Sequence, residues 1–369
     1  MIAVAVLIVI VVLERSVTGG IVGLLGGLVG ALIGFAVLQA GLLVGAVALR
    51  ARVRRIVVGV GPRIGQWRLG TRSVALRAVP VMLSVAVGPG RAPVRPRLWG
   101  ASMVSAVSGV TVAVGLAILG SGALWHGAAV GCTAAVILVL LPRRDAAVTS
   151  TGWILVNYPR LTGREAAELD ASALVAEVSD AVHVGDLAAA ERIAERLATD
   201  HAALRSATLA RVVVLEANGR YAEAMRLVLD LLRDPEIEQL DFTTTMAGLA
   251  GLSAAAVEAG QLDGELGLPA AERAIADAER LNYPSHRLTG TKALVRLLRG
   301  DTDGAITLAT TATGLGEDTV SRADDLATLA RAYMAAGDNV RAREVLGAAE
   351  RLAPWWPRVA GTRARLDLD

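Results

Sequence analysis

The side chains that most often carry catalysis or metal binding are few and scattered in this sequence. The histidines are His126, His183, His201 and His286, and no two of them have the spacing of metal ligands. Cys132 is the only cysteine and lies in an apolar run, which excludes a disulfide framework and argues against redox chemistry. No glycine-rich phosphate loop precedes a Lys and a Ser or Thr, and there is no Gly-x-Ser-x-Gly nucleophile motif. The sequence therefore predicts no cofactor.

One apolar stretch has the spacing of a zinc site but different side chains. Two imidazoles at i and i+4 lie on one helix face and bind a single Zn²⁺, and a Glu beside the first takes a proton from the metal-bound water. Here Leu38 and Leu42 hold the i and i+4 positions and Gln39 holds the position of the Glu. Leucine has no lone pair, and a glutamine amide does not take up a proton near neutral pH. We expect these residues to be inactive.

The same stretch resembles the opening of the site-2 protease family of membrane-embedded zinc metalloproteases. The apolar run that ends at Leu49 is followed by the basic segment 50–55 and by the turn Gly59-Val60-Gly61-Pro62, which is similar to the Gly-aromatic-Gly-Pro turn of that family. Aligning on this turn puts the first His of the family motif at Leu38, the Glu at Gln39 and the second His at Leu42. The resemblance covers roughly residues 30–160 and implies a membrane domain with a small sheet that positions substrate.

The resemblance also implies a third zinc ligand, an Asp that follows an Asn-x-x-Pro sequence. The segment 139–142, Val-Leu-Leu-Pro, stands in the Asn-x-x-Pro place, with Val139 for the Asn. Downstream, the segment 150–153 is similar to the Asp-Gly segment and has Thr151 where the Asp is expected. The family comparison therefore implies a member without its ligands and its base, with degenerate equivalents at Leu38, Gln39, Leu42 and Thr151.

Charge divides the chain into two parts. Before Arg160 there are 14 Arg against two acids, a net charge of 14 − 2 = +12, and the remainder has 37 − 14 = 23 basic and 35 − 2 = 33 acidic groups, a net charge of −10. Nucleic acid binding would need the basic groups on the soluble part, so we exclude it. We predict a membrane domain at 1–159, in contact with lipid, and a cytoplasmic helical domain at 160–369.

The apolar segments predict about four membrane spans, at residues 1–18, 20–49, 98–120 and 123–141. The first is short, and a signal-peptide core is the alternative. The intervening loop 50–97 has many arginines and no acid, which places it in the cytoplasm under the positive-inside rule. Strand-like segments at 56–60, 73–79 and 81–87 predict a small β element in this loop. The preference for Arg over Lys suggests a GC-rich bacterium and hence the bacterial inner membrane.

Glycines recur every four residues in the second predicted span. One series is Gly19, Gly23 and Gly27; another is Gly26, Gly30 and Gly34; a third pair is Gly41 and Gly45. Such spacing lets helix backbones approach closely in lipid. We interpret it as tight packing within one chain, with a dimer interface as the alternative.

The second half has the pattern of helical repeats. Turns of a Gly and a polar residue begin at Gly185, Gly219, Gly260, Gly300 and Gly337, with separations of 34, 41, 40 and 37 residues. This period and the small and large positions of the last unit are similar to those of tetratricopeptide repeats. The pattern predicts an α-solenoid that binds a protein or peptide on its concave face, with Glu216, Thr328 and Arg331 as partner-binding residues. The tail Trp355-Trp356-Pro357 has two interpretations, a cap on the last repeat and a membrane contact.

The fold class that we predict is mostly α, with a polytopic membrane domain, a small β element and an α-solenoid. The leading functional hypothesis is a catalytically inactive site-2 protease-like membrane protein that holds a protein partner. Two alternatives stay open at this point. One is an active intramembrane metalloprotease with unfamiliar ligands, and the other is a plain membrane anchor for a protein-binding repeat domain.

Overall fold

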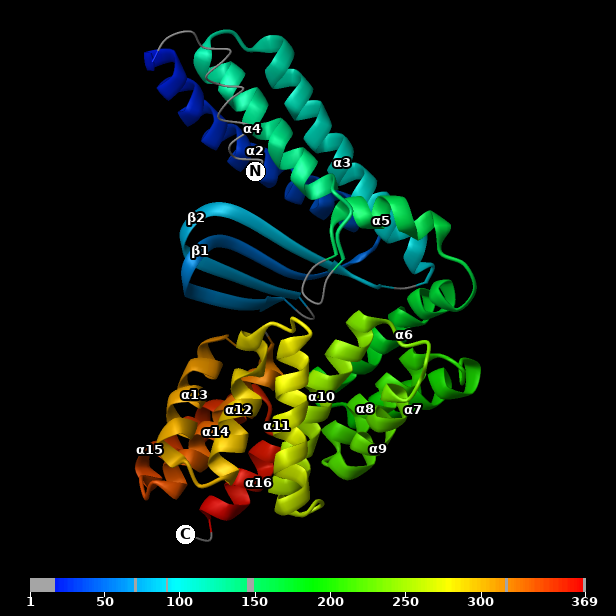
Figure 1. Ribbon diagram of the computed structural model, residues 1–369, viewed down its shortest axis with the longest axis vertical. Coiled ribbons are helices and arrows are strands. Elements are labelled where there is room, and N and C mark those ends of the chain that lie inside the picture. Colours follow the sequence, from blue (N-terminus) through cyan, green and yellow to red (C-terminus); the bar gives the residue numbers. More distant parts are fainter. Residues whose placement is uncertain (1–16, 70–71, 91, 145–148, 316–317, 368–369) are drawn as a thin grey trace. The chain divides into compact units, whose positions relative to one another are not determined.

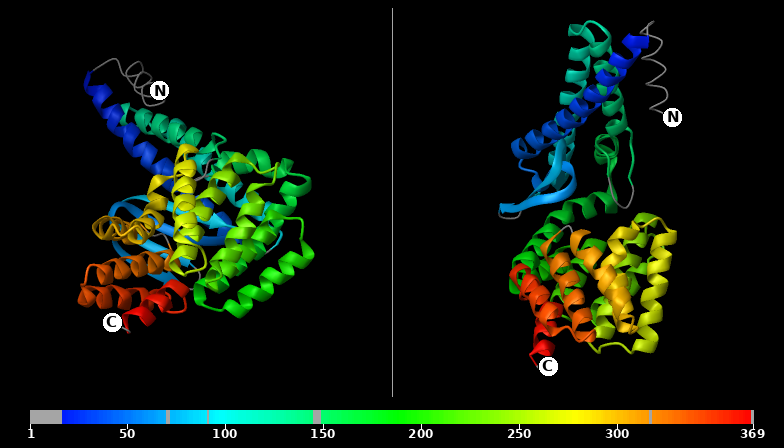
Figure 2. Two further views of the ribbon diagram at one scale, coloured as in Figure 1. Left: turned by 60° about the horizontal axis from the view of Figure 1, so that its bottom comes forward. Right: turned by 90° about the vertical axis from the view of Figure 1, so that its left-hand side faces the viewer.

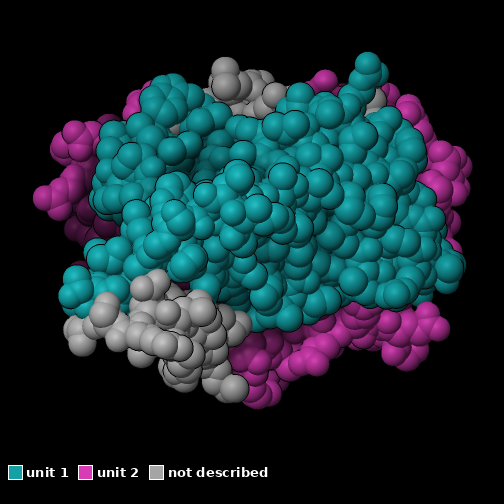
Figure 3. Space-filling view, turned by 90° about the horizontal axis from the view of Figure 1, so that it is seen from above, with its two compact units in different colours: residues 1–173 teal, residues 174–369 magenta. Residues whose placement is uncertain are grey.

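The computed structural model is mostly helical and contains one small sheet (Figure 1). It describes residues 17–69, 72–90, 92–144, 149–315 and 318–367. The chain divides into two compact units, residues 1–173 and 174–369, which Figure 3 shows in different colours. The division falls inside a helix, α6 (Gly163–Val184), rather than at the predicted boundary between residues 159 and 160.

The described residues of unit 1 form three long helices, a sheet and two short helical segments. Its elements in chain order are α2 (Val17–Ala48), β1 (Arg52–Leu69), β2 (Arg72–Gly88), α3 (Val94–Leu119), α4 (Ala123–Leu140), α5 (Thr151–Asn157) and η1 (Tyr158–Arg160), followed by the first part of α6. The long helices lie side by side and the sheet lies at one end of them (Figures 1 and 2).

Within the described residues, four helices are long and apolar enough to span a membrane. Three of them, α2, α3 and α4, match the predicted spans 20–49, 98–120 and 123–141. The predicted span 1–18 lies almost entirely outside the described residues. The fourth helix is α10 (Gln239–Glu258) of unit 2, whose alanines and leucines pack in the core of that unit against α9, α11 and α12. Its apolar composition is explained by this packing.

The glycine series of α2 contact the two neighbouring helices directly. A methyl group added at Gly26 or Gly30 would overlap the carbonyl oxygen of Leu124 or Ala128 on α4. The contact partners advance together along both helices, so α2 and α4 run parallel. Further along, a methyl group at Gly45 would lie 2.8 Å from the Cα atom of Ala101 on α3. The glycines therefore serve packing within one chain, as predicted.

The sheet is formed by two long bent strands, β1 and β2, that pair as antiparallel neighbours. The register pairs Val58 of β1 with both Leu83 and Leu76 of β2, so one segment of β1 has neighbours on two sides. Gly59 has φ +99° and Gly61 has φ +90°, values that glycine adopts readily, and they produce the bend in β1. The predicted strand segments are confirmed, and β1 extends beyond the predicted segment 56–60 in both directions.

Unit 2 is built from helices that follow one another in pairs. They are the end of α6, α7 (Leu187–Asp200), α8 (Arg205–Ala217), α9 (Tyr221–Leu232), α10, α11 (Gly264–Arg280), α12 (Thr289–Leu298), α13 (Thr302–Leu315), α14 (Thr319–Ala335), α15 (Asn339–Leu352) and α16 (Pro357–Leu366), with a short η2 (Ser285–Leu288) before α12. Each of the five predicted Gly turns joins the two helices of one pair. The first turn lies between α6 and α7, and the last lies between α14 and α15.

All five turn glycines have φ between 69° and 82°. At each turn, the glycine N–H and the following N–H donate to carbonyls of the preceding helix, which ends the helix and reverses the chain. In the last pair, Ala330, Ala342 and Leu346 are fully buried, as their small and large positions predict. The helical pairs are thus present, whereas their assignment as tetratricopeptide repeats stays a prediction.

The C-terminal tail connects the last helical pair to the first one. The indole N–H of Trp355 donates to the carbonyl of Val182 on α6 at 3.1 Å, and its ring lies against Gly185. Pro357 lies close to Gly219, the turn glycine of the second pair. The tail therefore packs inside unit 2 and closes it, which agrees with the capping interpretation but extends the cap to the first pairs.

Candidate functional site

The position of the first expected zinc ligand is occupied by apolar packing. Leu38 is 1% exposed and packs with Ala113 of α3 and with Cys132 and Val136 of α4. Its carbonyl oxygen accepts a hydrogen bond from the Ser105 hydroxyl at 2.7 Å. Where α2, α3 and α4 meet, the position of the expected ligand therefore holds the apolar side chain of Leu38.

Gln39, at the position of the expected base, connects α2 to the sheet. Its side-chain oxygen Oε1 accepts a hydrogen bond from the backbone N–H of Val85 in β2 at 2.8 Å. Leu42, one turn further along α2, packs with the cluster that includes Val53, Val85 and Val94. These two residues therefore hold the sheet against the helix. The side chain of Gln39 provides the hydrogen-bond acceptor that the buried N–H of Val85 needs.

We expect Gln39→Met to loosen the contact between α2 and β2. The substitution keeps the length of the side chain but removes the acceptor, and an unsatisfied buried N–H costs about 1–3 kcal/mol. Hydrogen–deuterium exchange of the peptide that covers residues 81–88 should become faster, and exchange in unit 2 should not change. Unchanged protection of the Val85 amide would contradict this role.

The third ligand position lies in a segment that packs against the same helices. Val139 packs against the cluster that contains Leu38. Thr151 begins α5, and Ser150 caps that helix by accepting from the N–H of Trp153 at 3.2 Å. A methyl group at Gly152 would overlap the carbonyl oxygen of Leu140, so this segment lies directly on the end of α4.

Unit 2 contains a cavity of about 530 Å³ inside the helical pairs. Its lining is rich in carboxylates, and these are Glu216, Asp318, Asp324 and Asp325. Arg287 and Arg358 are the arginines of the lining, and His183 and His286 also contribute. Asp318 is paired with His183, whose Nε2 lies 3.4 Å from its carboxylate. This volume is in the range of pockets that hold small ligands or a few side chains.

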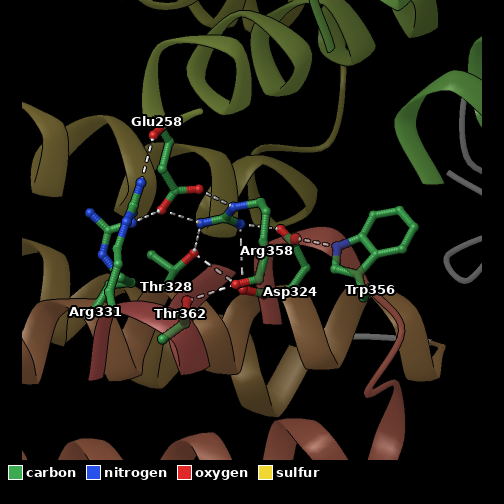
Figure 4. Close-up of polar contacts among 8 residues, drawn as sticks. Glu258, Asp324, Thr328, Arg331, Trp356, Arg358 and Thr362 are labelled. Atoms are coloured by element: carbon green, nitrogen blue, oxygen red, sulfur yellow. Dashed lines mark hydrogen bonds and ion pairs between the residues drawn. The ribbon is translucent and has the colours of Figure 1, made fainter. Parts of the chain in front are cut away.

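Arg358 of α16 is the centre of a buried polar network beside this cavity (Figure 4). It pairs with Glu258 of α10 and with Asp324 of α14, and its Nη2 donates to the Thr328 hydroxyl at 2.8 Å. Its side chain is 5% exposed, and the neighbouring carboxylates hold the pKa of the guanidinium above its usual range although burial alone would lower it. Arg331 donates to Glu258 at 2.7 Å, and the indole N–H of Trp356 donates to Asp324 at 2.6 Å.

The predicted partner-binding residues have different surroundings. Glu216 lines the cavity. Thr328 is 1% exposed and holds Arg358, and Arg331 holds Glu258, so both are engaged by the chain itself. Their role in partner binding stays a prediction. Sequence reasoning missed the network because its cation comes from the tail beyond the last turn, where only Pro357 at the start of α16 indicates a further helix.

Two carboxyls of the cavity are held away from their ordinary titration range. Burial raises the pKa of Glu216 to about 7, and the negative charges of Asp324 and Asp318 act in the same direction. The positive charge of Arg358 opposes this rise. The same causes raise the pKa of Asp325 to about 7. Among the described residues, neither carboxyl has a hydrogen bond or an ion pair.

These raised pKa values predict that the unliganded protein loses stability as the pH rises. Because the folded state keeps the protons that the unfolded chain releases near its ordinary carboxyl pKa, the stabilising contribution is complete below that pKa and is lost as the pH rises through about 7. Glu216→Gln should raise the free energy of unfolding at about pH 8 by roughly 2 kcal/mol and flatten the pH dependence. Thermal unfolding followed by circular dichroism between about pH 5 and 8 measures this. A steeper pH dependence in the variant would contradict it.

Within the residues that the structure describes, no group of three or more His, Cys, Asp and Glu side chains could hold a metal ion. The described residues form two kinds of contact at the positions considered: apolar and amide packing where α2, α3 and α4 meet, and ion pairs inside unit 2. Comparison with models of protein families, with curated proteins and with solved structures finds no match to this chain.

Proposed function

We propose that this protein is a membrane-anchored binding scaffold, a catalytically inactive relative of the site-2 proteases that holds a protein partner with unit 2. The observation that carries the proposal is the occupation of the ligand positions. Leu38 is buried among α3 and α4, and Gln39 is committed to a strand N–H. A working zinc site at this crossing would need imidazole and carboxylate groups where hydrocarbon and an amide stand.

The packing of unit 1 supports the relationship as well as the loss of activity. Val139, at the place of the family Asn, packs against the cluster of Leu38, and Gly152, next to Thr151, lies on the end of α4. The motif helix and the segment of the third ligand therefore approach the same three-helix crossing, although their order in the chain places them more than a hundred residues apart.

The arginines support an orientation in the bacterial inner membrane with unit 2 in the cytoplasm. Arg50 follows the end of α2, Arg95 and Arg97 lie in the first turn of α3, and Arg143 and Arg144 follow the end of α4. Because α2 and α4 run parallel and α3 runs antiparallel to them, all of these groups lie at one end of the bundle. A cluster of arginines at one end is typical of the cytoplasmic side.

The metal content of the purified full chain tests the inactive assignment. We expect less than stoichiometric zinc after purification in the presence of added zinc, and no cleavage of transmembrane peptides that a chelator suppresses. Stoichiometric zinc bound in unit 1, or chelator-sensitive cleavage that Gln39→Ala abolishes, would overturn the proposal in favour of an active metalloprotease.

Crosslinking in native membranes tests the scaffold role. We expect the full chain to capture a discrete protein partner, and we expect the capture to be lost when unit 2 is removed. A fragment that starts near Arg160 and replaces the whole chain in cells would indicate instead that unit 1 is a plain anchor.

A further inference from the structure

The lining of the cavity in unit 2 has more carboxyl groups than arginines to pair with them. Four carboxylates line it, and two of them already have partners: Asp324 pairs with Arg358, and Asp318 pairs with His183. Glu216 and Asp325 have none among the described residues. Arg287 lines the same cavity but is exposed at its edge.

A buried hydroxyl points to a missing ligand at the same place. Tyr221 of α9 lines the cavity and is 3% exposed, yet its hydroxyl has no hydrogen-bond partner among the described residues. Tyr221 lines the cavity together with Glu216, Asp324 and Arg358, and burial raises the pKa of its hydroxyl. A buried polar group without a partner costs free energy, and a ligand that accepts or donates there would recover it.

One side of the cavity is already occupied by a cation of the chain, Arg358. The guanidinium of Arg358 lies beside it, paired with two carboxylates and hydrogen-bonded to Thr328, with the ring of Trp356 next to Asp324 (Figure 4). Planar guanidinium groups match carboxylate pairs in this way because they donate in a fixed fork. Glu216, Asp325 and Tyr221 offer a second set of acceptors with the same character and without a cation.

We propose that this cavity binds a guanidinium or ammonium cation between Glu216, Asp325 and Tyr221. This inference rests on the proposed function and names the chemistry by which unit 2 recognises its partner, an exposed arginine or lysine side chain. A free small amine offers the same chemistry, and the two sources are separated below by the probe.

Calorimetric titration of the full chain in detergent tests the site. The probes are N-acetyl-arginine amide and its neutral isostere N-acetyl-citrulline amide, which has the same shape without the charge. We expect the arginine compound to bind at about pH 8 at least about tenfold more tightly than the citrulline compound, and more weakly at about pH 6, where both carboxyls hold protons.

Three variants and one control locate the binding. Glu216→Gln and Asp325→Asn should each weaken binding about tenfold or more, and Tyr221→Phe about threefold, because each removes one acceptor from the cation. Glu216→Gln is expected to stabilise the unliganded protein, so lost binding in that variant is not lost folding. Glu272→Gln removes an exposed carboxylate that pairs with Arg299 on the surface of the same unit and should leave affinity unchanged.

A peptide probe distinguishes between a protein segment and a free small amine as the source of the cation. A heptapeptide of alanines with one central arginine that binds more tightly than N-acetyl-arginine amide identifies a protein segment as the ligand, and the reverse order identifies a small amine. Equal binding of the citrulline compound, no measurable heat from any cation, or an unchanged affinity in Glu216→Gln would overturn the proposal. These outcomes are independent of partner capture in membranes, which tests the scaffold role itself.

Discussion

Replacement of Gly131 by alanine is expected to disrupt unit 1 even though it adds only one methyl group. The new Cβ would overlap the carbonyl oxygen of Gly27, and a backbone atom cannot move aside as a side chain can. The helices α2 and α4 would have to separate along their length, because Gly127 makes the same contact with Gly23 one turn earlier. We expect a loss at or above the roughly 3 kcal/mol at the upper end of overpacking effects.

The measurement is the midpoint temperature at which the full chain in detergent stops eluting as a single species. For a unit of this size, the expected loss corresponds to a midpoint lower by roughly 6–12 °C. Gly115→Ala on α3 is the matched control, because a methyl group there meets nothing within 4 Å. It should leave the midpoint unchanged or raise it slightly through helix propensity. Equal behaviour of the two variants would mean that α2 and α4 do not pack through their glycines.

Removal of the buried cation of unit 2 should have an effect of similar size. Arg358→Met leaves Glu258, whose side chain is 7% exposed, facing only Arg331, and leaves Asp324 without its ion pair. Breaking a buried pair from one side typically costs about 3–5 kcal/mol, because the remaining charge stays desolvated. We expect the helical transition to move down by roughly 6–20 °C.

Arg363→Ala provides the comparison on the same helix. Arg363 also pairs with a carboxylate, Glu350, but both side chains are partly exposed, and such pairs contribute about 0–1 kcal/mol. In thermal unfolding followed by circular dichroism, Arg358→Met should therefore have a clearly lower melting temperature than Arg363→Ala. If Arg358→Met and Arg363→Ala had the same melting temperature, the network around Arg358 would contribute no more to stability than an exposed ion pair.

Turns and spans were accessible from the sequence because their signals are local. The glycines at the five turns of unit 2 are at positions where the chain needs positive φ, and the uncharged runs of α2, α3 and α4 identify candidate spans directly. The segments 73–79 and 81–87 were predicted as two strands, but both belong to β2, which continues through Pro80. Pro80 lies between Val79, which pairs with Val60, and Leu83, which pairs with Val58, at an irregularity of the register where a missing N–H is tolerated.

The polar site of unit 2 could not be predicted in the same way. Glu258, Asp324 and Arg358 lie far apart in the chain, and each of them alone has the appearance of an ordinary charge on a helix. Only the return of the tail to α10 and α14 brings them together. Glu216 was identified from its place in the helical repeats, whereas nothing in the sequence distinguishes Tyr221, because an unsatisfied hydroxyl has no sequence signature.

The tail that closes unit 2 also sets an order of events during synthesis. Trp355 and Arg358 complete contacts with α6 and α10 that were translated long before. Until Arg358 has left the ribosome, α10 and α14 lack the cation that pairs with their carboxylates. Domains form from the N-terminus onward, so unit 1 can fold before unit 2 is closed. The nascent chain therefore passes through a stage in which Glu258 and Asp324 are made but Arg358 has not yet reached them.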